Sequence, residues 1–373
     1  MNIPPFTLER YFARHEFSAK YLLSSSDCES LKLTELLEMA SPDMRKTFFD
    51  LKLGYTESMG HPQLRAEAAA IYDGIHADQT LIAAPEEAIF LLMHALLQPG
   101  DHVISTFPGY QSLYEIAGSI GCQLSRWEPD EAAGWHFDLA RLESLLTPQT
   151  KLVVANFPHN PTGYVPSHAE FDALIGMLRE RGIYLLSDEM YRFLEIESGS
   201  TLPSACEAYE RAFSLFGMSK TFGLPGLRIG WIATQDAATL ARMLELKDYT
   251  TICSSAPSEI LSIIALQNKQ TIIDTQNARL ARNFALLDEF FAARPDRFTL
   301  NRPRGGSICF PRMLGVKSTL EFADKIVAEA GIMIAPSHVF NYGDQHFRMG
   351  FGRENFGEVL GLFGAYVDKI ERG

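Results

Sequence analysis

Seven short apolar runs occur between about residue 79 and residue 233, each rich in Val, Ile, Leu or aromatic side chains. The segments between them are longer and have helical periodicity. This alternation predicts a mostly parallel sheet with crossover helices on both faces. The expected strands are Thr80–Ala83, His102–Thr106, Cys122–Trp127, Lys151–Asn156, Ile183–Ser187, Ala212–Phe216 and Ile229–Ala233. Two of the intervening helices have clear limits, Glu86–Leu97 after Pro85 and His168–Arg181 before Gly182.

The pattern changes after residue 235, where helical segments become longer and strands shorter. The expected elements are helical Gln235–Gln267, a long helix Thr271–Ala293, strand Phe298–Pro311 with a break at Gly305-Gly306, helix Thr319–Ala330, strands Ile332–Ala335 and Phe347–Phe351, and a closing helix from Glu354. We therefore expect a three-layer α-β-α large domain over residues 45–275, with a hinge near residue 275. Residues 1–44 and 276–373 should form a smaller α+β domain with an N-terminal arm.

Composition narrows the class of protein. A chain of 373 residues that is 46% apolar can bury a large core, which excludes a disordered or fibrous protein. The 33 Lys and Arg residues against 46 Asp and Glu give a net charge of −13, so nucleic acid is not an expected partner. The longest apolar run, Ala88 to Leu97, is about half of what a membrane span needs. The N-terminus has prolines and charges instead of a secretory signal, so we expect a cytoplasmic protein without membrane association.

Polar side chains follow three of the expected strands. Lys151–Asn156 continues into FPHNPTG, Ile183–Ser187 into Asp188-Glu189-Met190-Tyr191, and Ala212–Phe216 into GMSKTFGLPGLRIGW. Ligands of open α/β sheets bind beyond the carboxyl ends of the strands. One edge of the sheet should therefore carry Asn160, Asp188, Tyr191, Lys220 and Arg228.

These motifs, in this order from Tyr55 to Arg348, resemble those of the fold-type I pyridoxal-phosphate (PLP) enzymes of the class I/II aminotransferase family. The resemblance implies pyridoxal 5'-phosphate as cofactor, with no metal. It implies transfer of an amino group between an amino acid and a 2-oxo acid. It also implies a homodimer with shared active sites.

Lys220 and Asp188 are the expected centre of the chemistry. Lys220 lies in a Gly-rich loop after an apolar strand, where the family has its Schiff-base lysine, and a partly desolvated amine near other cations can be neutral and nucleophilic. The alternative is an ordinary surface lysine. Asp188 should be buried, and the resemblance implies that it pairs with the pyridinium nitrogen of the cofactor. A helix N-cap would also explain Asp188, although not Tyr191 three residues later.

The resemblance also assigns roles to four further side chains. Asn160 and Tyr191 are expected to donate to the phenolic oxygen of the cofactor, which lowers the pKa of the Schiff base. Tyr110, in F-P-G-Y, is expected to stack on its ring, and Arg348 to bind the substrate α-carboxylate through its planar guanidinium group. Taken singly, Asn160 could belong to an ordinary turn, Tyr110 and Tyr191 to the core, and Arg348 to the surface of an edge strand.

The cofactor phosphate should be held by Arg228, eight residues after Lys220, and by the Ser219 hydroxyl. The family's G-[SA]-x-E-A loop is replaced by Ala84-Pro85-Glu86-Glu87-Ala88, and Gly217 stands where a serine or threonine is common. Proline removes one backbone donor, but the Glu86 and Glu87 amides at the helix N-terminus remain available to an anion. Tyr55 is expected to reach the phosphate in the neighbouring subunit.

The sequence leaves two hypotheses for the reaction. YLLSSSDCE near the N-terminus and RGGSICFPR at Arg304–Arg312 resemble the branch that contains capreomycidine synthase, which favours elimination, replacement or cyclisation at Cβ as the alternative to transamination. Glu16, Asp27 or Glu29 could bind a cationic substrate side chain, and Arg312 an anionic one. A non-catalytic sensor domain of a transcription regulator would need a basic DNA-binding segment, which does not precede the fold here.

Overall fold

The computed structural model describes residues 3–197 and 199–369. Its largest sheet has seven strands in the spatial order β2-β8-β7-β6-β5-β3-β4, and all are parallel except β8, which runs antiparallel to β2 and β7. The strands are β2 Thr80–Ala83, β3 His102–Thr106, β4 Gln123–Trp127, β5 Thr150–Asn156, β6 Tyr184–Asp188, β7 Ala212–Gly217 and β8 Gly230–Thr234. The predicted mostly parallel sheet is confirmed.

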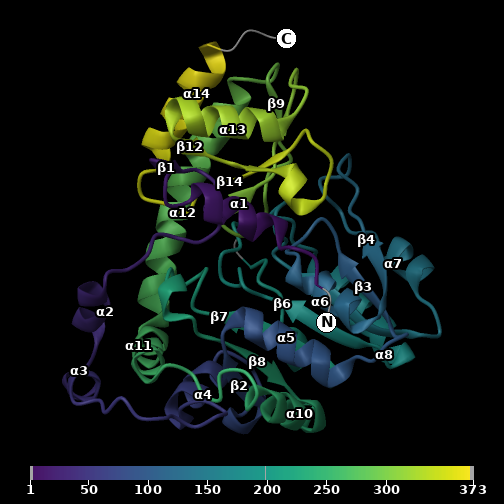
Figure 1. Cartoon of the computed structure of the whole chain (residues 1–373), viewed down its shortest axis with the longest axis vertical. Coiled ribbons are helices and arrows are strands. Elements are labelled where there is room, and N and C mark those ends of the chain that lie inside the picture. Colours follow the sequence, from purple (N-terminus) through teal and green to yellow (C-terminus); the bar gives the residue numbers. More distant parts are fainter. Residues whose placement is uncertain (1–2, 198, 370–373) are drawn as a thin grey trace.

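Alternate side chains of the central strands face opposite layers of helices. Leu152 and Val154 of β5 pack in a cluster with α5, α6 and α10, whereas Val153 and Ala155 pack in another with α7 and α8. The sheet is thus the middle of three layers, as predicted (Figure 1). The helices of this part are α4 Pro62–Ala69, α5 Pro85–Leu96, α6 Ser112–Ile120, α7 Leu139–Leu145, α8 His168–Arg181, α9 Ala205–Ala208, α10 Ala237–Lys247 and α11 Ala256–Gln267, with short 3-10 turns Ala77–Gln79 and Pro225–Leu227.

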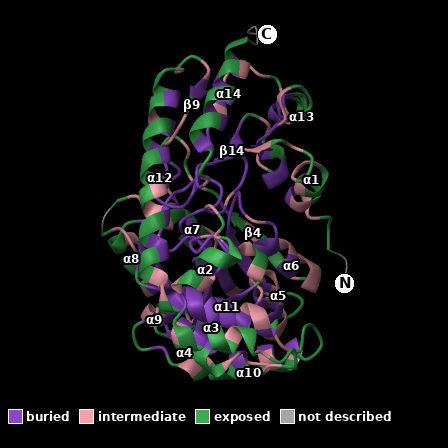
Figure 2. Ribbon diagram, turned by 90° about the vertical axis from the view of Figure 1, so that its left-hand side faces the viewer, coloured by how far each residue is buried: buried purple, intermediate pink, exposed green. Residues whose placement is uncertain are grey.

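The long helix α12, Lys269–Ala292, connects the sheet layers to a smaller α+β part (Figure 1). One side of α12 is buried along its length (Figure 2). The smaller part contains α1 Thr7–His15, β1 Tyr21–Leu22, β9 Phe298–Thr299, β10 Ile308–Cys309, β11 Arg312–Met313, α13 Thr319–Ala330, β12 Ile332–Met333, β13 Ala335–Pro336, the 3-10 turn η3 Ser337–Phe340, β14 Phe347–Gly350 and α14 Phe356–Lys369. Helices α2 Leu33–Met39 and α3 Pro42–Phe49 lead from it to the large part. Because α12 is unbroken at residue 275, the domain limits remain a prediction.

Three predicted elements differ from the structure. Ile332–Ala335 is not one strand, because β12 ends at Met333 and pairs with β1, whereas β13 begins at Ala335 and pairs with β14. Gln235–Gln267 contains two helices, because residues 248–255 form a loop in which Ile252 has a φ of 65°. The Thr251 hydroxyl of this loop donates to the Glu87 carboxylate at 2.7 Å. Phe298–Pro311 is strand only at its two ends. Tertiary contacts therefore override local helical and strand preference in the latter two segments.

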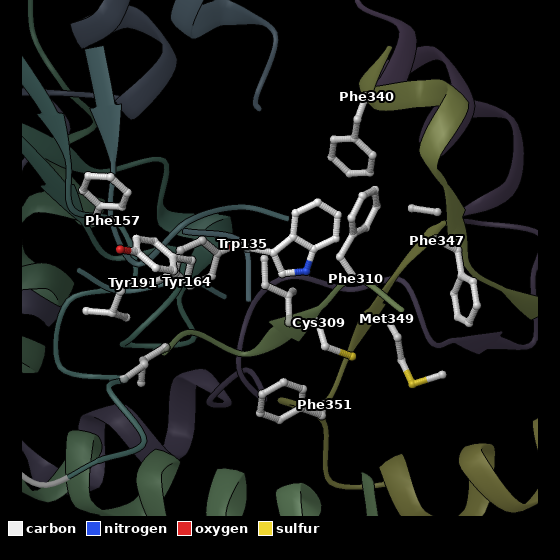
Figure 3. Close-up of a cluster of buried hydrophobic side chains, with 14 of the residues drawn as sticks. Trp135, Phe157, Tyr164, Tyr191, Cys309, Phe310, Phe340, Phe347, Met349 and Phe351 are labelled. Atoms are coloured by element: carbon white, nitrogen blue, oxygen red, sulfur yellow. The ribbon is translucent and has the colours of Figure 1, made fainter. Parts of the chain in front are cut away.

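An aromatic core joins the two parts of the molecule (Figure 3). The Trp135 and Phe310 ring centroids lie 5.9 Å apart, and Phe310 packs on Phe340 at 5.8 Å. The same buried cluster includes Tyr191, next to β6, and Met349 on β14. This packing fixes the end of β6 relative to the strand that carries Arg348.

Gly350, at the end of β14, permits close backbone contact with the N-terminal segment. Its amide donates to the Leu23 carbonyl at 2.8 Å, and a Cβ atom here would lie 1.6 Å from the Ser25 carbonyl oxygen. Only glycine fits this approach, which brings residues 23–27 alongside the strand of Arg348.

No helix among the described residues is long and apolar enough to cross a bilayer.

Candidate active site

The carboxyl ends of β5 and β6 meet at a buried asparagine that the sequence motifs had not indicated. Asn156 Nδ2 donates to the Asp188 carbonyl at 3.0 Å, and Asn156 Oδ1 accepts from the Asn160 amide at 2.7 Å. Asn156 and Asp188 are also partners in the register of the two strands. One side chain thereby holds the loop of Asn160 against the turn that follows Asp188.

The Lys220 amine lies at the centre of the site. Its Nζ donates to the Ser26 hydroxyl at 2.8 Å, across 194 positions of the chain. Burial lowers the pKa of Lys220, and the positive charge of Arg348 acts in the same direction, while Asp27, Glu9 and Asp188 oppose it. The amine is therefore easier to deprotonate than that of a surface lysine, as nucleophilic attack requires.

Asp188 is a buried carboxyl group, with a side chain that is only 6% exposed. Its Oδ1 accepts the Met190 amide at 3.1 Å, and no described residue forms an ion pair with it. Burial raises the pKa of Asp188 to about 7, and the nearby charge of Glu86 adds to the rise. A buried carboxylate without a cation is costly, so this position suits a positively charged ligand group such as a pyridinium.

Arg348 is 2% exposed and lies opposite Asn160. Its Nη1 donates to Asn160 Oδ1 at 3.2 Å, and its Nη2 donates to the Ser24 carbonyl at 3.0 Å. The guanidinium carbon lies 5.6 Å from the centre of the Phe12 ring and 5.3 Å from that of Phe340. These contacts fix the plane of the guanidinium group, whereas its Nε has no partner among the described residues.

Tyr191 and Tyr110 are both close enough to Arg348 to influence its ionisation. Tyr191 is 2% exposed, and its hydroxyl has no hydrogen-bond partner within the described chain. The Tyr110 hydroxyl donates to Glu9 Oε1 at 2.9 Å, and its ring packs against Phe6 at 4.9 Å. An unpaired buried hydroxyl costs free energy, so Tyr191 is suited to donate to a bound group.

The expected phosphate end is built around the start of α5. Pro85 is the first residue of the helix, which leaves the Glu86 and Glu87 amides free for an anion, as the sequence predicts. The Glu87 carboxylate is engaged by the loop after α10, where it accepts hydrogen bonds from the Thr250 and Thr251 hydroxyls. Ser219 is buried at 6% exposure.

Arg228 is exposed in the isolated chain, unlike Ser219 and Asp188. Its φ of 54° is left-handed, and its Nη1 donates to the nearby Pro225 carbonyl at 3.1 Å. Burial raises the pKa of Glu86, and the Arg228 guanidinium group is close enough to that carboxyl to oppose part of the rise. Arg228 therefore lies at the mouth of the site, beside the N-terminus of α5.

The two departures from the family motif, Pro85 and Gly217, are structurally linked. Gly217 pairs with Gly230 across β7 and β8, and a Cβ atom on Gly217 would lie 2.8 Å from the Gly230 Cα. The Pro85 ring packs on both glycines, 2.8 Å from where a Cβ of Gly230 would be. A serine side chain at position 217 therefore has no room. The chain that has a proline at position 85 thus also lacks a side-chain hydroxyl at position 217.

Tyr55 lies outside the site of its own chain, with 90% of its surface exposed. The segment around it is nevertheless anchored. Buried Lys247 donates to the Ser58 carbonyl at 2.7 Å, and buried Glu259 accepts the His61 amide at 3.0 Å. An exposed tyrosine on an anchored segment can be presented to a second chain.

Four residues at the site were not assigned by the motifs. They are Glu9, Phe12, Ser26 and Asn156. Glu9 and Phe12 lie on α1, and Ser26 lies in the YLLSSSDCE segment. These three residues contact the site only through the tertiary fold. The spacing of Glu9 and Phe12 on one helix face was the available signal, although it does not reveal what that face covers.

Known proteins resemble this chain over most of its length. The sequence profile for aminotransferase class I and II matches residues 20–356. A capreomycidine synthase from Streptomyces vinaceus is 29% identical over 352 residues, which cover 94% of this chain and 90% of that protein. An aspartate aminotransferase from Sulfolobus acidocaldarius is 28% identical over 321 residues, covering 80% of this chain and 78% of that protein.

A solved structure extends the similarity to the complete fold. The PLP-dependent aminotransferase from Streptococcus suis 89-1591 superposes with a TM-score of 0.94 at 31% sequence identity, over 100% of both chains. The predicted fold and cofactor are confirmed by these similarities, and the unpartnered Tyr191 hydroxyl and unpaired Asp188 fit such a cofactor. The chain belongs to the class I and II aminotransferase family of PLP-dependent enzymes.

Proposed function

We propose that this enzyme is an aminotransferase that moves an amino group between an amino acid and a 2-oxo acid through Lys220. The observation that carries the proposal is the convergence of Lys220, Asp188 and Arg348 on one buried site. A nucleophilic amine, a buried carboxyl group without a cation and a buried arginine together match a cofactor aldehyde, its ring nitrogen and a substrate carboxylate.

Each proposed residue has a defined task. Asp188 would hold a proton at the ring nitrogen, Asn160 and Tyr191 would bind the phenolic oxygen, and Tyr110 would cover the ring. Pyridoxal phosphate, when bound, supplies an electron sink that stabilises negative charge at the substrate α-carbon. The freed Lys220 amine would then move the α-proton as a general base. The phosphate would be bound by the set Ser219, Arg228 and the amides of Glu86 and Glu87.

Arg348 would fix the substrate in the reactive orientation. Its plane is held by Asn160, Ser24 and the two flanking rings, so it can bind a carboxylate without first reorganising. Its unpartnered Nε offers a further donor. This arrangement limits the directions in which the bonds of the substrate α-carbon can point.

We also propose a homodimer in which Tyr55 contacts the phosphate bound by the partner. Tyr55 belongs to a group of large apolar side chains that remain exposed in the single chain. They are Phe49 at 69%, Leu53 at 82%, Tyr55 at 90%, Tyr249 at 91% and Ile252 at 47%. Exposed apolar surface of this extent is typical of an interface. Arg228, exposed at the mouth of the site, would be covered by the same association.

The proposed reaction is tested with the PLP-loaded enzyme and a panel of single amino acids without any oxo acid. At least one amino acid is expected to convert the cofactor absorbance to that of a stable pyridoxamine form, and 2-oxoglutarate or another 2-oxo acid should restore the starting spectrum. A panel of all common amino acids that produces no such conversion would contradict transamination.

The similarity to capreomycidine synthase favours a second candidate, in which the same site carries out elimination, replacement or cyclisation at Cβ. The two candidates differ in the fate of the cofactor. Chemistry at Cβ consumes the amino acid and returns the cofactor unchanged, whereas transamination leaves the amino group on it. Substrate loss without a pyridoxamine form would therefore favour the second candidate. Membership in an enzyme family argues against the sensor-domain alternative.

A further inference from the structure

One face of α1 is turned toward the active site. Glu9, Phe12 and Glu16 are spaced by three and four residues, so they lie on the same side of the helix, and Glu16 keeps the αR conformation at the C-cap. The adjoining side of the helix is anchored in the smaller part by buried Leu8 and by Tyr11, whose hydroxyl donates to the Ile334 carbonyl at 3.0 Å. Figure 1 shows α1 between the α+β part and the large sheet.

Contacts along this face place it over the substrate position. Glu9 accepts the hydrogen bond from Tyr110, and the Phe12 ring lies over the Arg348 guanidinium group. Glu16 follows at the other end of the same face. It is close enough to Lys220, Asp27 and Arg353 for all three to influence its ionisation.

Glu16 differs from the neighbouring acids because it has no partner. Asp27 is paired with Arg353 at 3.0 Å, and the Glu29 carboxylate accepts the Glu354 amide at 2.8 Å. The Glu16 amide donates to the Phe12 carbonyl at 2.8 Å, but no hydrogen bond or ion pair joins the Glu16 carboxylate to any other residue in the described ranges. Burial, followed by the negative charges of Asp27 and Glu9, raises the pKa of Glu16. A half-buried carboxylate in this setting is stabilised only when a cation binds.

The same space contains two other polar groups that need a ligand. The Tyr191 hydroxyl and the Arg348 Nε lack partners on side chains that are each 2% exposed, and both residues lie within electrostatic range of Asp27. The Arg312 guanidinium group, the alternative contact for an anionic side chain, instead donates to the Gln345 side chain, and the Arg312 backbone forms a β-bridge with His346. The site thus has a cationic end at Arg348 and an acidic end at Glu16.

We propose that Glu16, assisted by Glu9 on the same face of α1, binds a positively charged group at the end of the substrate side chain. The substrate class is an amino acid that carries an amine or guanidine there, held at its other end by Arg348. This inference rests on the proposed function for the binding of an amino acid to the PLP enzyme, although it does not depend on which reaction follows.

The test titrates the PLP-loaded enzyme with amino acids and follows the change in cofactor absorbance, which reports binding. L-Arginine is compared with L-citrulline, and L-lysine and L-ornithine with L-norleucine, because each comparison keeps similar length while removing the charge. At least one cationic amino acid is expected to half-saturate the enzyme at a concentration at least about tenfold lower than its neutral match. Equal or tighter binding of the neutral members throughout would overturn the proposal.

A charge-matched set of variants locates the effect. Glu16→Gln should lower the cationic-to-neutral preference at least about tenfold, whereas Glu289→Gln, on the exposed side of α12, should leave it unchanged. Glu16→Asp, which keeps the charge, should retain more of the preference than Glu16→Gln, and thermal melting verifies that each variant is folded. An unchanged preference in folded Glu16→Gln would refute the role of Glu16.

The outcomes separate this proposal from the proposed function. Cationic preference without a pyridoxamine form would contradict transamination and support the Glu16 site. A pyridoxamine form that appears equally well with neutral amino acids would support transamination and overturn the Glu16 site. Absence of any spectral response to these five amino acids would overturn the Glu16 site, and absence of a response to every common amino acid would overturn both proposals.

Discussion

Replacing Lys220 by alanine is expected to lower turnover by about 10⁴-fold or more. The variant loses the covalent attachment of the cofactor and also the general base, and proton transfer by a positioned base alone contributes about 10²–10⁴-fold. Steady-state turnover with the preferred amino donor gives the measurement. Lys317→Ala, a surface change on the loop before α13, is the control and should retain wild-type turnover.

The structure also indicates that Lys220→Ala should fold. The half-buried Lys220 side chain has a lowered pKa and a single hydrogen bond, to Ser26, so its removal leaves no charged partner unpaired. Loss of turnover would therefore reflect lost chemistry, which unchanged circular dichroism and melting would verify. Substantial turnover in the folded variant would mean that another residue performs these tasks.

An Asp188→Asn change is expected to lower the activity of the enzyme while raising the stability of the cofactor-free protein. Turnover should fall at least about 10²-fold, because a neutral amide no longer holds a proton at the ring nitrogen of the cofactor. The cofactor-free protein should become more stable at pH 8 by about 2–4 kcal/mol, since asparagine removes a buried, unpaired charge but can still accept the Met190 amide.

The pH dependence of this gain has a definite sign. Burial raises the pKa of Asp188 from its ordinary value of 3.8 to about 7 in the folded protein. Its contribution to stability is therefore fully present below pH 4 and is lost as the pH rises toward 7. The advantage of the variant should shrink between pH 8 and pH 5, as measured by denaturant unfolding. Added PLP should stabilise the wild type more than the variant. A destabilised cofactor-free variant at pH 8 would contradict an unpaired Asp188.

The strands of the large sheet could be predicted because they are short, buried and separated by periodic helices. Thr80–Ala83 and His102–Thr106 have the predicted limits, and α8 ends at Arg181 before Gly182, whose φ is 64°. Local signals decide such features. The loop at residues 248–255 could not be predicted, because its conformation depends on Glu87, more than 160 positions away.

The residues of the candidate site likewise divide into those that local sequence signals predict and those that depend on distant contacts. Motifs next to strand ends placed Asn160, Asp188 and Lys220 on one edge, since the topology of a parallel sheet brings those ends together. Glu9 and Ser26 were not predicted, because each meets the site through contacts of more than 100 positions in sequence.

The central claim is that pyridoxal phosphate is bound covalently at Lys220. Borohydride reduction of the PLP-loaded wild-type enzyme, followed by proteolysis and peptide mass spectrometry, tests it most directly. We predict a single cofactor adduct, located on Lys220 in the peptide that contains GMSKTFGLPG. An adduct on any other lysine, or none in an enzyme that retains its cofactor absorbance, would contradict the account.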